Sequence, residues 1–286
     1  MPYIEPPGAA EFIPEHATPG GLRKAVQSCR GCDLYAHATQ AVFGEGPSSA
    51  EIVFIGEQPG DEEDRQGHPF VGPSGKLLDR ALADAGIDRS LVYVTNAVKH
   101  FKFEERGKRR LHKKPGGLEI RACRPWLEAE INLIQPSIIV CLGATAAQSI
   151  FGGTYRLTKE RGQFVRNSWA PHVTSTVHPS AILRAPDEQQ RHIEYQKFVA
   201  DLRKYTACGR DSANRALLFR IPEFRDNTCV YGPLRARKSS SAFNCRAAFS
   251  RFWVFWIKKK SRARPGYLRG LLGHFANHAL VVVIVL

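Results

Sequence analysis

Short apolar runs alternate along this chain with longer segments whose apolar residues have helical spacing. The apolar runs are residues 51–56, 91–95, 137–142 and 173–177. The helical segments are residues 74–85, 119–134, 144–150 and 187–205. A continuous apolar run of this length is typical of a buried strand, and strands that alternate with helices favour a parallel sheet covered on both faces. We therefore expect an α/β fold, a three-layer α/β/α sandwich with a central, mainly parallel four-stranded sheet.

The two ends of the chain do not continue this pattern. Residues 1–20 are rich in Pro, Gly and Ala, which predicts an irregular lead-in. Residues 206–286 show no sustained period and carry 15 Lys and Arg against 3 Asp and Glu. Their last eight residues are apolar, too few to cross a bilayer, so no membrane partner is expected. The sequence thus predicts one domain over residues 21–205, followed by a basic tail of unassigned fold.

The positive charge outside the tail is concentrated in one short segment. Residues 99–114 carry 8 basic and 2 acidic side chains, within a chain of net charge +14. Such a segment attracts nucleic-acid phosphates, although a solvated run of charges is the ordinary explanation. His112 lies inside this segment. Neighbouring cations would lower the pKa of His112 and keep the ring neutral and nucleophilic.

Cys29 and Cys32 have the spacing of a metal site. The first thirty residues contain no apolar run that would indicate export, so a reducing, cytoplasmic location is expected. There a Cys-x2-Cys pair indicates zinc, an iron–sulfur cluster or a redox dithiol. Two further metal ligands are needed, and the candidates are Cys123, Cys141 and a histidine. Cys141 lies in an apolar run, where a free cysteine usually behaves as a small hydrophobe.

Polar side chains follow three of the predicted strands and are expected at one edge of the sheet. They are Glu57 and Gln58, Asn96, and His178. A histidine there can donate a hydrogen bond to a developing anion. Phe70, on a turn before a helix, can stack on a base. Each motif alone is also compatible with an ordinary turn or a core residue.

Together, these segments resemble the iron–sulfur branch of the uracil-DNA glycosylase superfamily. The match runs from Leu22 to Tyr205. Its motifs, in order, are Gly56-Glu-x-Pro-Gly60, Pro69-Phe-Val-Gly-x-Ser-Gly75, Thr95-Asn96, Cys123-Arg-Pro125 and His178-Pro-Ser180. Gln58 and the segment Lys108-Arg-Arg-Leu-His112 are similar to UdgX-type proteins, which excise uracil and stay covalently attached to the DNA.

The resemblance implies a role for each matching residue. Uracil would be bound by Gln58, Phe70 and Asn96. Catalysis would use three residues: His178 on the departing uracil anion, Glu57 beside the cationic sugar, and His112 as the nucleophile that attacks the sugar. DNA phosphates would be bound by Lys108, Arg109, Arg110 and Ser180.

The resemblance also implies a 4Fe–4S cluster. Cys29, Cys32 and Cys123 match cluster ligands. His100 stands where the ordinary iron–sulfur glycosylases have a fourth cysteine, and for this reason we prefer it to Cys141. Mixed cysteine and histidine ligation has a chemical precedent in Rieske centres.

The expected function is excision of uracil from DNA, followed by a covalent bond between His112 and the abasic sugar. The expected partner is uracil-containing DNA, single strands included, and the expected protein is a monomer. Two alternatives stay open. One is a turnover glycosylase in which His112 only binds phosphate. The other is a metal-containing nucleic-acid-binding module that is not an enzyme.

Overall fold

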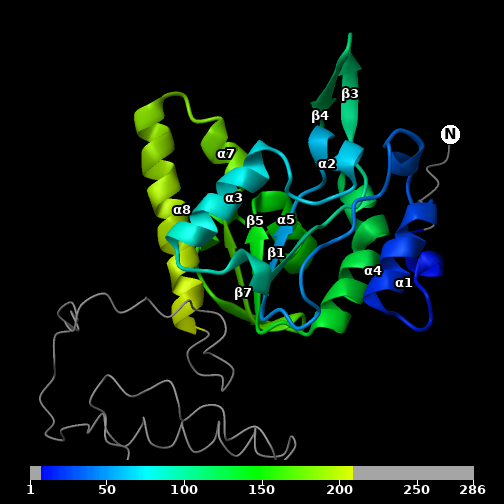
Figure 1. The fold of residues 1–286 in the computed structure, drawn as a ribbon, viewed down its shortest axis with the longest axis horizontal. Helices are drawn as coiled ribbons and strands as arrows, with labels where there is room; N and C mark the ends of the chain where they lie inside the picture. The colour runs from blue at the N-terminus through cyan, green and yellow to red at the C-terminus, as the bar shows by residue number, and fades with distance from the viewer. Residues whose placement is uncertain (1–7, 209–286) are drawn as a thin grey trace, which may run out of the picture. The chain divides into compact units, whose positions relative to one another are not determined.

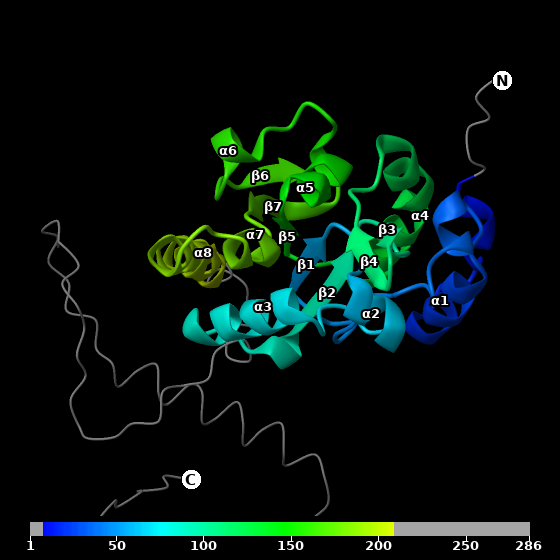
Figure 2. The ribbon, with the colours of Figure 1, turned by 90° about the horizontal axis from the view of Figure 1, so that it is seen from above.

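A computed structural model describes residues 8–208 and contains a five-stranded sheet with the strand order β2-β1-β5-β7-β6 (Figures 1 and 2). Four strands are parallel to their neighbours: β1 (Ile52–Gly56), β2 (Val92–Asn96), β5 (Ile138–Leu142) and β7 (Ala170–Thr176). β6 (Val165–Asn167) pairs antiparallel with β7 at one edge. The predicted mainly parallel sheet is confirmed, with one short strand more than the sequence indicated.

Alternate residues of β1 enter two different cores, which makes the fold three-layered. Ile52 and Phe54 pack with helices α3 (Pro73–Asp84), α7 (Pro179–Leu183) and α8 (Glu188–Cys208). Val53 and Ile55 pack with α4 (Gly117–Ile134) and α5 (Ala144–Phe151). Because side chains alternate between the faces of a strand, the fully apolar run of β1 fills both layers.

A third core joins the N-terminal segment to α4. Leu22 of α1 (Pro19–Ala25) and the turns that follow it pack against Trp126 of α4. Ala9 N donates to Ala122 O at 2.8 Å, so the lead-in also contacts this helix. The segment contains three short 3-10 turns, Ala10–Phe12, Val26–Ser28 and Asp33–Ala36, and a fourth, Arg89–Leu91, precedes β2.

The basic segment is a β-hairpin, which the sequence analysis did not predict. β3 (Phe103–Arg106) pairs antiparallel with β4 (Arg109–His112), and the hairpin projects above the sheet in Figure 1. Two short helices, α2 (Asp61–Gln66) and α6 (Leu157–Glu160), were also not predicted. α8 continues to Cys208, three residues beyond the predicted domain end. No helix within residues 8–208 is both long and apolar enough to cross a membrane.

Candidate active site

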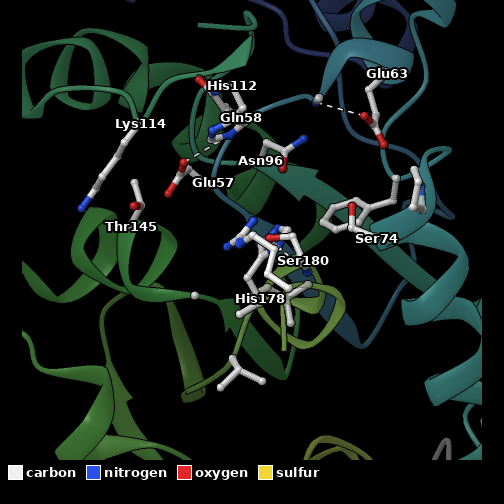
Figure 3. A pocket seen from close by; sticks show the side chains of 18 of the residues that line it. Glu57, Gln58, Glu63, Ser74, Asn96, His112, Lys114, Thr145, His178 and Ser180 are labelled. Carbon is white, nitrogen blue, oxygen red and sulfur yellow. Dashed lines mark hydrogen bonds and ion pairs between the residues drawn. The ribbon is translucent and has the colours of Figure 1, made fainter. Parts of the chain in front are cut away.

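A cavity of about 740 Å³ lies at the carboxyl ends of the parallel strands. Seven of the residues singled out from the sequence line it: Glu57, Gln58, Phe70, Asn96, His112, His178 and Ser180. Figure 3 shows several of these side chains directed into the same space from different elements. The predicted convergence of polar groups at this edge of the sheet is therefore confirmed.

The hairpin brings His112 to Glu57, which follows β1. The two atoms His112 Nε2 and Glu57 Oε1 are 3.5 Å apart, and both side chains retain access to the cavity, at 48% and 21% exposure. Burial lowers the pKa of His112, Glu57 opposes this, and Arg184 lowers it further. The direction of the shift agrees with the sequence analysis. Its cause differs, because burial comes first and Arg184 is not part of the basic segment.

Gln58 holds the base of the hairpin. Its Nε2 atom donates to Lys102 O at 3.1 Å and to Lys113 O at 3.0 Å. Its Oε1 atom accepts from Lys102 N at 3.1 Å. Lys102 precedes β3 and Lys113 follows β4, so one carboxamide joins the two ends of the hairpin. Gln58 lines the cavity as expected, yet its amide is engaged by protein backbone rather than left free.

Arg110 faces the protein rather than solvent. Its guanidinium forms ion pairs with Asp61 and Asp64 of α2, and lies 5.0 Å from the centre of the Phe103 ring. The Asp64 side chain has no solvent exposure, so the pair is largely desolvated. Lys108 and Arg109 at the turn are exposed. Of the three cations predicted to bind phosphate, these two are the ones open to a ligand.

The floor of the cavity is built around Gly56. A Cβ atom at this position would lie 2.3 Å from Asn96 Oδ1 and 2.8 Å from Phe70 Cζ. Phe70 has a φ of +58°, unusual for a bulky residue, and a Cβ on Gly75 would collide with Phe70 O at 1.6 Å. The two glycines thus allow an aromatic ring and a carboxamide to meet at one point.

Glu63 ties together the two loops that carry these groups. Its buried carboxylate accepts from Gly60 N at 3.0 Å and from Gly72 N at 2.8 Å. Gly60 ends the loop that begins at Glu57, and Gly72 follows Phe70. The dashed line at Glu63 in Figure 3 marks the first of these bonds. Glu63 could not be singled out from the sequence, because its partners are backbone groups.

His178 is held as a neutral hydrogen-bond donor. Its Nδ1 atom accepts from Ser180 N at 3.1 Å, so the remaining ring proton of the neutral form lies on Nε2. Burial, together with Arg184 and His112, lowers the pKa of His178 to about 4. The hydroxyl of Ser180 also lies 2.8 Å from Nδ1. Ser180 therefore orients the histidine, whatever else it binds.

Three cysteines share the third core, as the ligand prediction requires. Cys29, Cys32 and Cys123 are buried there, and burial raises the pKa of Cys123, with a further contribution from each of the two other thiols. Trp126 Nε1 donates to Cys29 Sγ and Lys99 N donates to Cys123 Sγ, both at 3.2 Å. Within the described part of the chain, however, no three His, Cys, Asp or Glu side chains are gathered closely enough to hold a metal ion.

The two candidates for a fourth ligand lie in different places. Cys141 is buried in β5 and packs in the core between the sheet and α4–α5, away from the other thiols. His100 is buried directly after Lys99, whose backbone contacts Cys123. Burial lowers the pKa of His100 to about 4, which leaves the ring neutral. The packing of Cys141 agrees with its expected role as a small hydrophobe.

Several polar residues of the cavity wall were not predicted as site residues from the sequence, among them Lys114, Thr145 and Arg184. Lys114 and Arg184 supply cations, and Thr145 lies in the first turn of α5. Figure 3 shows Lys114 extending toward Thr145. The only sequence signal for Thr145 was its place after a strand and a glycine. Lys114 and Arg184 are ordinary surface cations in sequence, and only the fold directs them to the cavity.

The sequence is similar to characterised glycosylases over the domain that contains this cavity. The profile of the Uracil DNA glycosylase superfamily matches residues 43–203. A Type-4 uracil-DNA glycosylase of Thermotoga maritima is 39% identical over 173 residues, 60% of this chain and 86% of that protein. The Type-4 enzyme of Archaeoglobus fulgidus is 35% identical over 194 residues, 65% of this chain and 92% of that protein. A Type-5 enzyme of Pyrobaculum aerophilum is 26% identical over 178 residues. The chain belongs to the uracil DNA glycosylase superfamily.

Proposed function

We propose that this protein excises uracil from DNA and that His112 then captures the abasic sugar. The observation that carries the proposal is the meeting of His112 and Glu57 at 3.5 Å on the wall of a cavity that Phe70 and Asn96 also line. The family and the names of the relatives support the glycosylase step. The capture step is supported by the position of His112 alone.

The cavity suits a single flipped nucleotide. A base in a duplex must leave the stack before its glycosidic bond is accessible. The Phe70 ring offers a stacking surface, and the Asn96 carboxamide offers a donor and an acceptor for the polar edge of uracil. The volume of about 740 Å³ leaves room for the attached sugar.

The two charges that develop during excision each have a partner. The departing uracil carries negative charge, and the Nε2 proton of His178 is available to it. The sugar becomes cationic, and the carboxylate of Glu57 can stabilise it. Because the pKa of His178 is lowered to about 4, the ring donates as a neutral group at ordinary pH.

Capture is a substitution at the C1′ atom of the sugar. A ring nitrogen of His112 forms the bond to C1′ while the bond from C1′ to uracil breaks, and the electron pair leaves with the uracil. The ring then loses its proton to solvent and remains attached as a neutral imidazole. An N-glycosidic histidine is a poor substrate for hydrolysis, so one protein molecule would act once. The lowered pKa of His112 favours the neutral, nucleophilic ring.

We further propose that Cys29, Cys32, Cys123 and His100 would hold a 4Fe–4S cluster. Support comes from the shared burial of the three thiols and from the N–H groups of Trp126 and Lys99 that donate to sulfur. Such bonds favour the thiolate form that ligates a metal. When bound, the cluster would cross-link the N-terminal segment to α4, and no step of excision uses it.

A turnover glycosylase is the second candidate, and the names of the relatives favour it. Proteins 31–39% identical to this chain are named Type-4 uracil-DNA glycosylases. In such an enzyme water would take the position proposed for the His112 nucleophile. His112 and the exposed cations Lys108 and Arg109 would then only bind phosphate.

The test is release of free base from labelled DNA. A single-stranded oligonucleotide with one uracil is incubated with the protein, and the free base is separated and counted. Uracil release, with none from a thymine control, is the expected result. A protein that binds both oligonucleotides and releases no base would contradict the proposal and favour a nucleic-acid-binding module.

A further inference from the structure

An ion pair is buried behind the floor of the cavity. The side chains of Lys99 and Glu130 are each 1% exposed, and Lys99 Nζ donates to a carboxylate oxygen of Glu130. Glu130 also accepts from Gly44 N and Tyr93 OH, each at 3.0 Å. Removing two charges from water costs much of the free energy that their attraction returns, so a buried ion pair is weak evidence for a purely stabilising role.

Lys99 contacts both the base-binding residue Asn96 and the cysteine site. Its Nζ atom donates to Asn96 O at 2.9 Å, and its backbone N donates to Cys123 Sγ at 3.2 Å. The Asn96 side chain lines the cavity, whereas Cys123 belongs to the third core. One residue therefore connects two sites that otherwise lie in separate parts of the fold.

We propose that Lys99 is a positioning residue that couples Asn96 to the cysteine site, with Glu130 as its counter-ion. For its effect on uracil, the inference rests on the proposed function. The ammonium group of Lys99 fixes the carbonyl of Asn96 and so the start of the turn after β2. That turn is otherwise held by Ala97 N, which donates to Gly56 O at 2.9 Å, and Val98 N, which donates to Glu57 O at 3.1 Å.

The same turn therefore sets the position of several groups used in the proposed reaction. Gly56 lies against the Asn96 carboxamide, and Glu57 follows it in the chain. A movement of Lys99 would shift Asn96 directly and the loop of Glu57 through its backbone bond. Toward the cysteine site, the backbone N–H of Lys99 donates to Cys123 Sγ, so the same movement would also change the contact with this sulfur.

The experiment replaces both charges at once. Lys99→Met alone would leave Glu130 as an unpaired buried charge and would destabilise the fold, which hides any positioning effect. The Lys99→Met/Glu130→Gln double variant keeps the side-chain volumes and leaves an amide oxygen for Gly44 N and Tyr93 OH. Three readouts are taken on the full-length protein purified without oxygen: thermal unfolding, the single-turnover rate of uracil release at saturating protein together with the protein concentration that gives half of this rate, and the visible absorption of the cluster.

We expect the double variant to unfold at nearly the wild-type temperature while its saturating single-turnover rate of uracil release falls at least about tenfold. This is the scale of one lost charge-assisted hydrogen bond. The visible absorption should change shape or decay faster in the presence of a chelator. Tyr93→Phe is the matched control, because it removes a bond from the same network without touching Asn96 or Cys123. This variant should keep both the single-turnover rate and the spectrum.

A wild-type single-turnover rate and a wild-type spectrum in the double variant would overturn the proposal. If the double variant does not fold, Lys99→Gln is the second arm, since it retains a donor toward Glu130 but lacks the charge and reach of lysine. The same loss of the single-turnover rate is expected, and an unchanged rate would again overturn the proposal. Failure of the proposed function can be told apart from failure of this inference. If the proposed function is wrong, the wild-type protein itself releases no uracil, and the visible spectrum then tests whether Lys99 is coupled to the cysteine site.

Discussion

His112 Nε2 lies 3.5 Å from Glu57 Oε1, although one residue ends a hairpin strand and the other follows a strand of the central sheet. In the proposed reaction the carboxylate would orient the ring and stabilise positive charge on the sugar beside it. Neither side chain alone would provide this arrangement. The pair makes His112 the group whose replacement separates capture from excision.

Replacing His112 with serine should abolish the covalent product and leave free abasic DNA. The smaller side chain opens a place for water, which can attack the same carbon. Product is measured by alkaline cleavage of the labelled strand, and the adduct by its mobility in a denaturing gel. His68→Ser, an exposed histidine outside the cavity lining, is the control and should behave as wild type. An adduct that persists in His112→Ser would show that another residue is the nucleophile.

Replacing Gln58 with alanine should slow capture more than excision. Three hydrogen bonds to Lys102 and Lys113 would be lost, so the base of the hairpin and with it His112 would move more freely. We expect the rate of adduct formation to fall at least about tenfold, the scale of one or two such bonds. Single-turnover rates of uracil release and adduct formation are compared in one time course. Gln66→Ala, at an exposed site on α2, is the control. An equal loss in both rates would instead favour a direct role for Gln58 in the uracil pocket.

Substitutions of the two neighbouring arginines of the hairpin, Arg109 and Arg110, should have different effects. Arg110→Met leaves the unexposed Asp64 without its main counter-ion and should lower the free energy of unfolding by about 3 kcal/mol. Arg109→Ala should leave stability unchanged and weaken DNA binding, with the slope of log Kd against log salt reduced by about 1. Denaturant melts and salt titrations of binding measure the two effects. A salt slope that responds to Arg110 and not to Arg109 would reverse this assignment.

Acid should destabilise the protein through His178. The folded ring has a pKa lowered to about 4, whereas an unfolded histidine titrates near 6.5. Between these values the unfolded chain binds more protons, so stability falls as the pH is lowered through this window. From pH 7 to pH 4 the wild type should lose about 3 kcal/mol more than His178→Gln, measured by denaturant unfolding. Equal losses in the two proteins would mean that the folded ring is not held neutral.

The four long strands were predictable because β1, β2 and β5 are buried along their whole length and β7 is buried over its last four residues. β1, β2 and β5 are apolar enough to be recognised as strands although apolar and polar residues do not alternate along them. β6 has three residues and two of them are exposed, so it has no pattern to recognise. The hairpin was hidden by its charge, since β3 and β4 are mostly polar. Gly107-Lys108, a two-residue turn with a φ of +60° at the glycine, was the one signal that could have revealed it.

The candidate site was predictable where residues follow strands and unpredictable where they contact distant backbone. Glu57, Asn96 and His178 lie at strand ends, so the fold class alone places them together. The contacts that Gln58 makes with carbonyl groups 44 and 55 positions away were not predictable, because a backbone carbonyl has no sequence signature. Lys99 and Glu130 are charged residues in a core, where sequence patterns lead one to expect apolar side chains.

One denaturing gel tests uracil excision and capture together. The wild-type protein is incubated with a labelled single-stranded oligonucleotide carrying one uracil, boiled in detergent and run beside an aliquot treated with alkali and a thymine control. We predict a uracil-dependent band with the summed mass of protein and DNA that survives boiling. Abasic DNA that is cut by alkali, with no shifted band, would contradict capture by His112 and leave a turnover glycosylase.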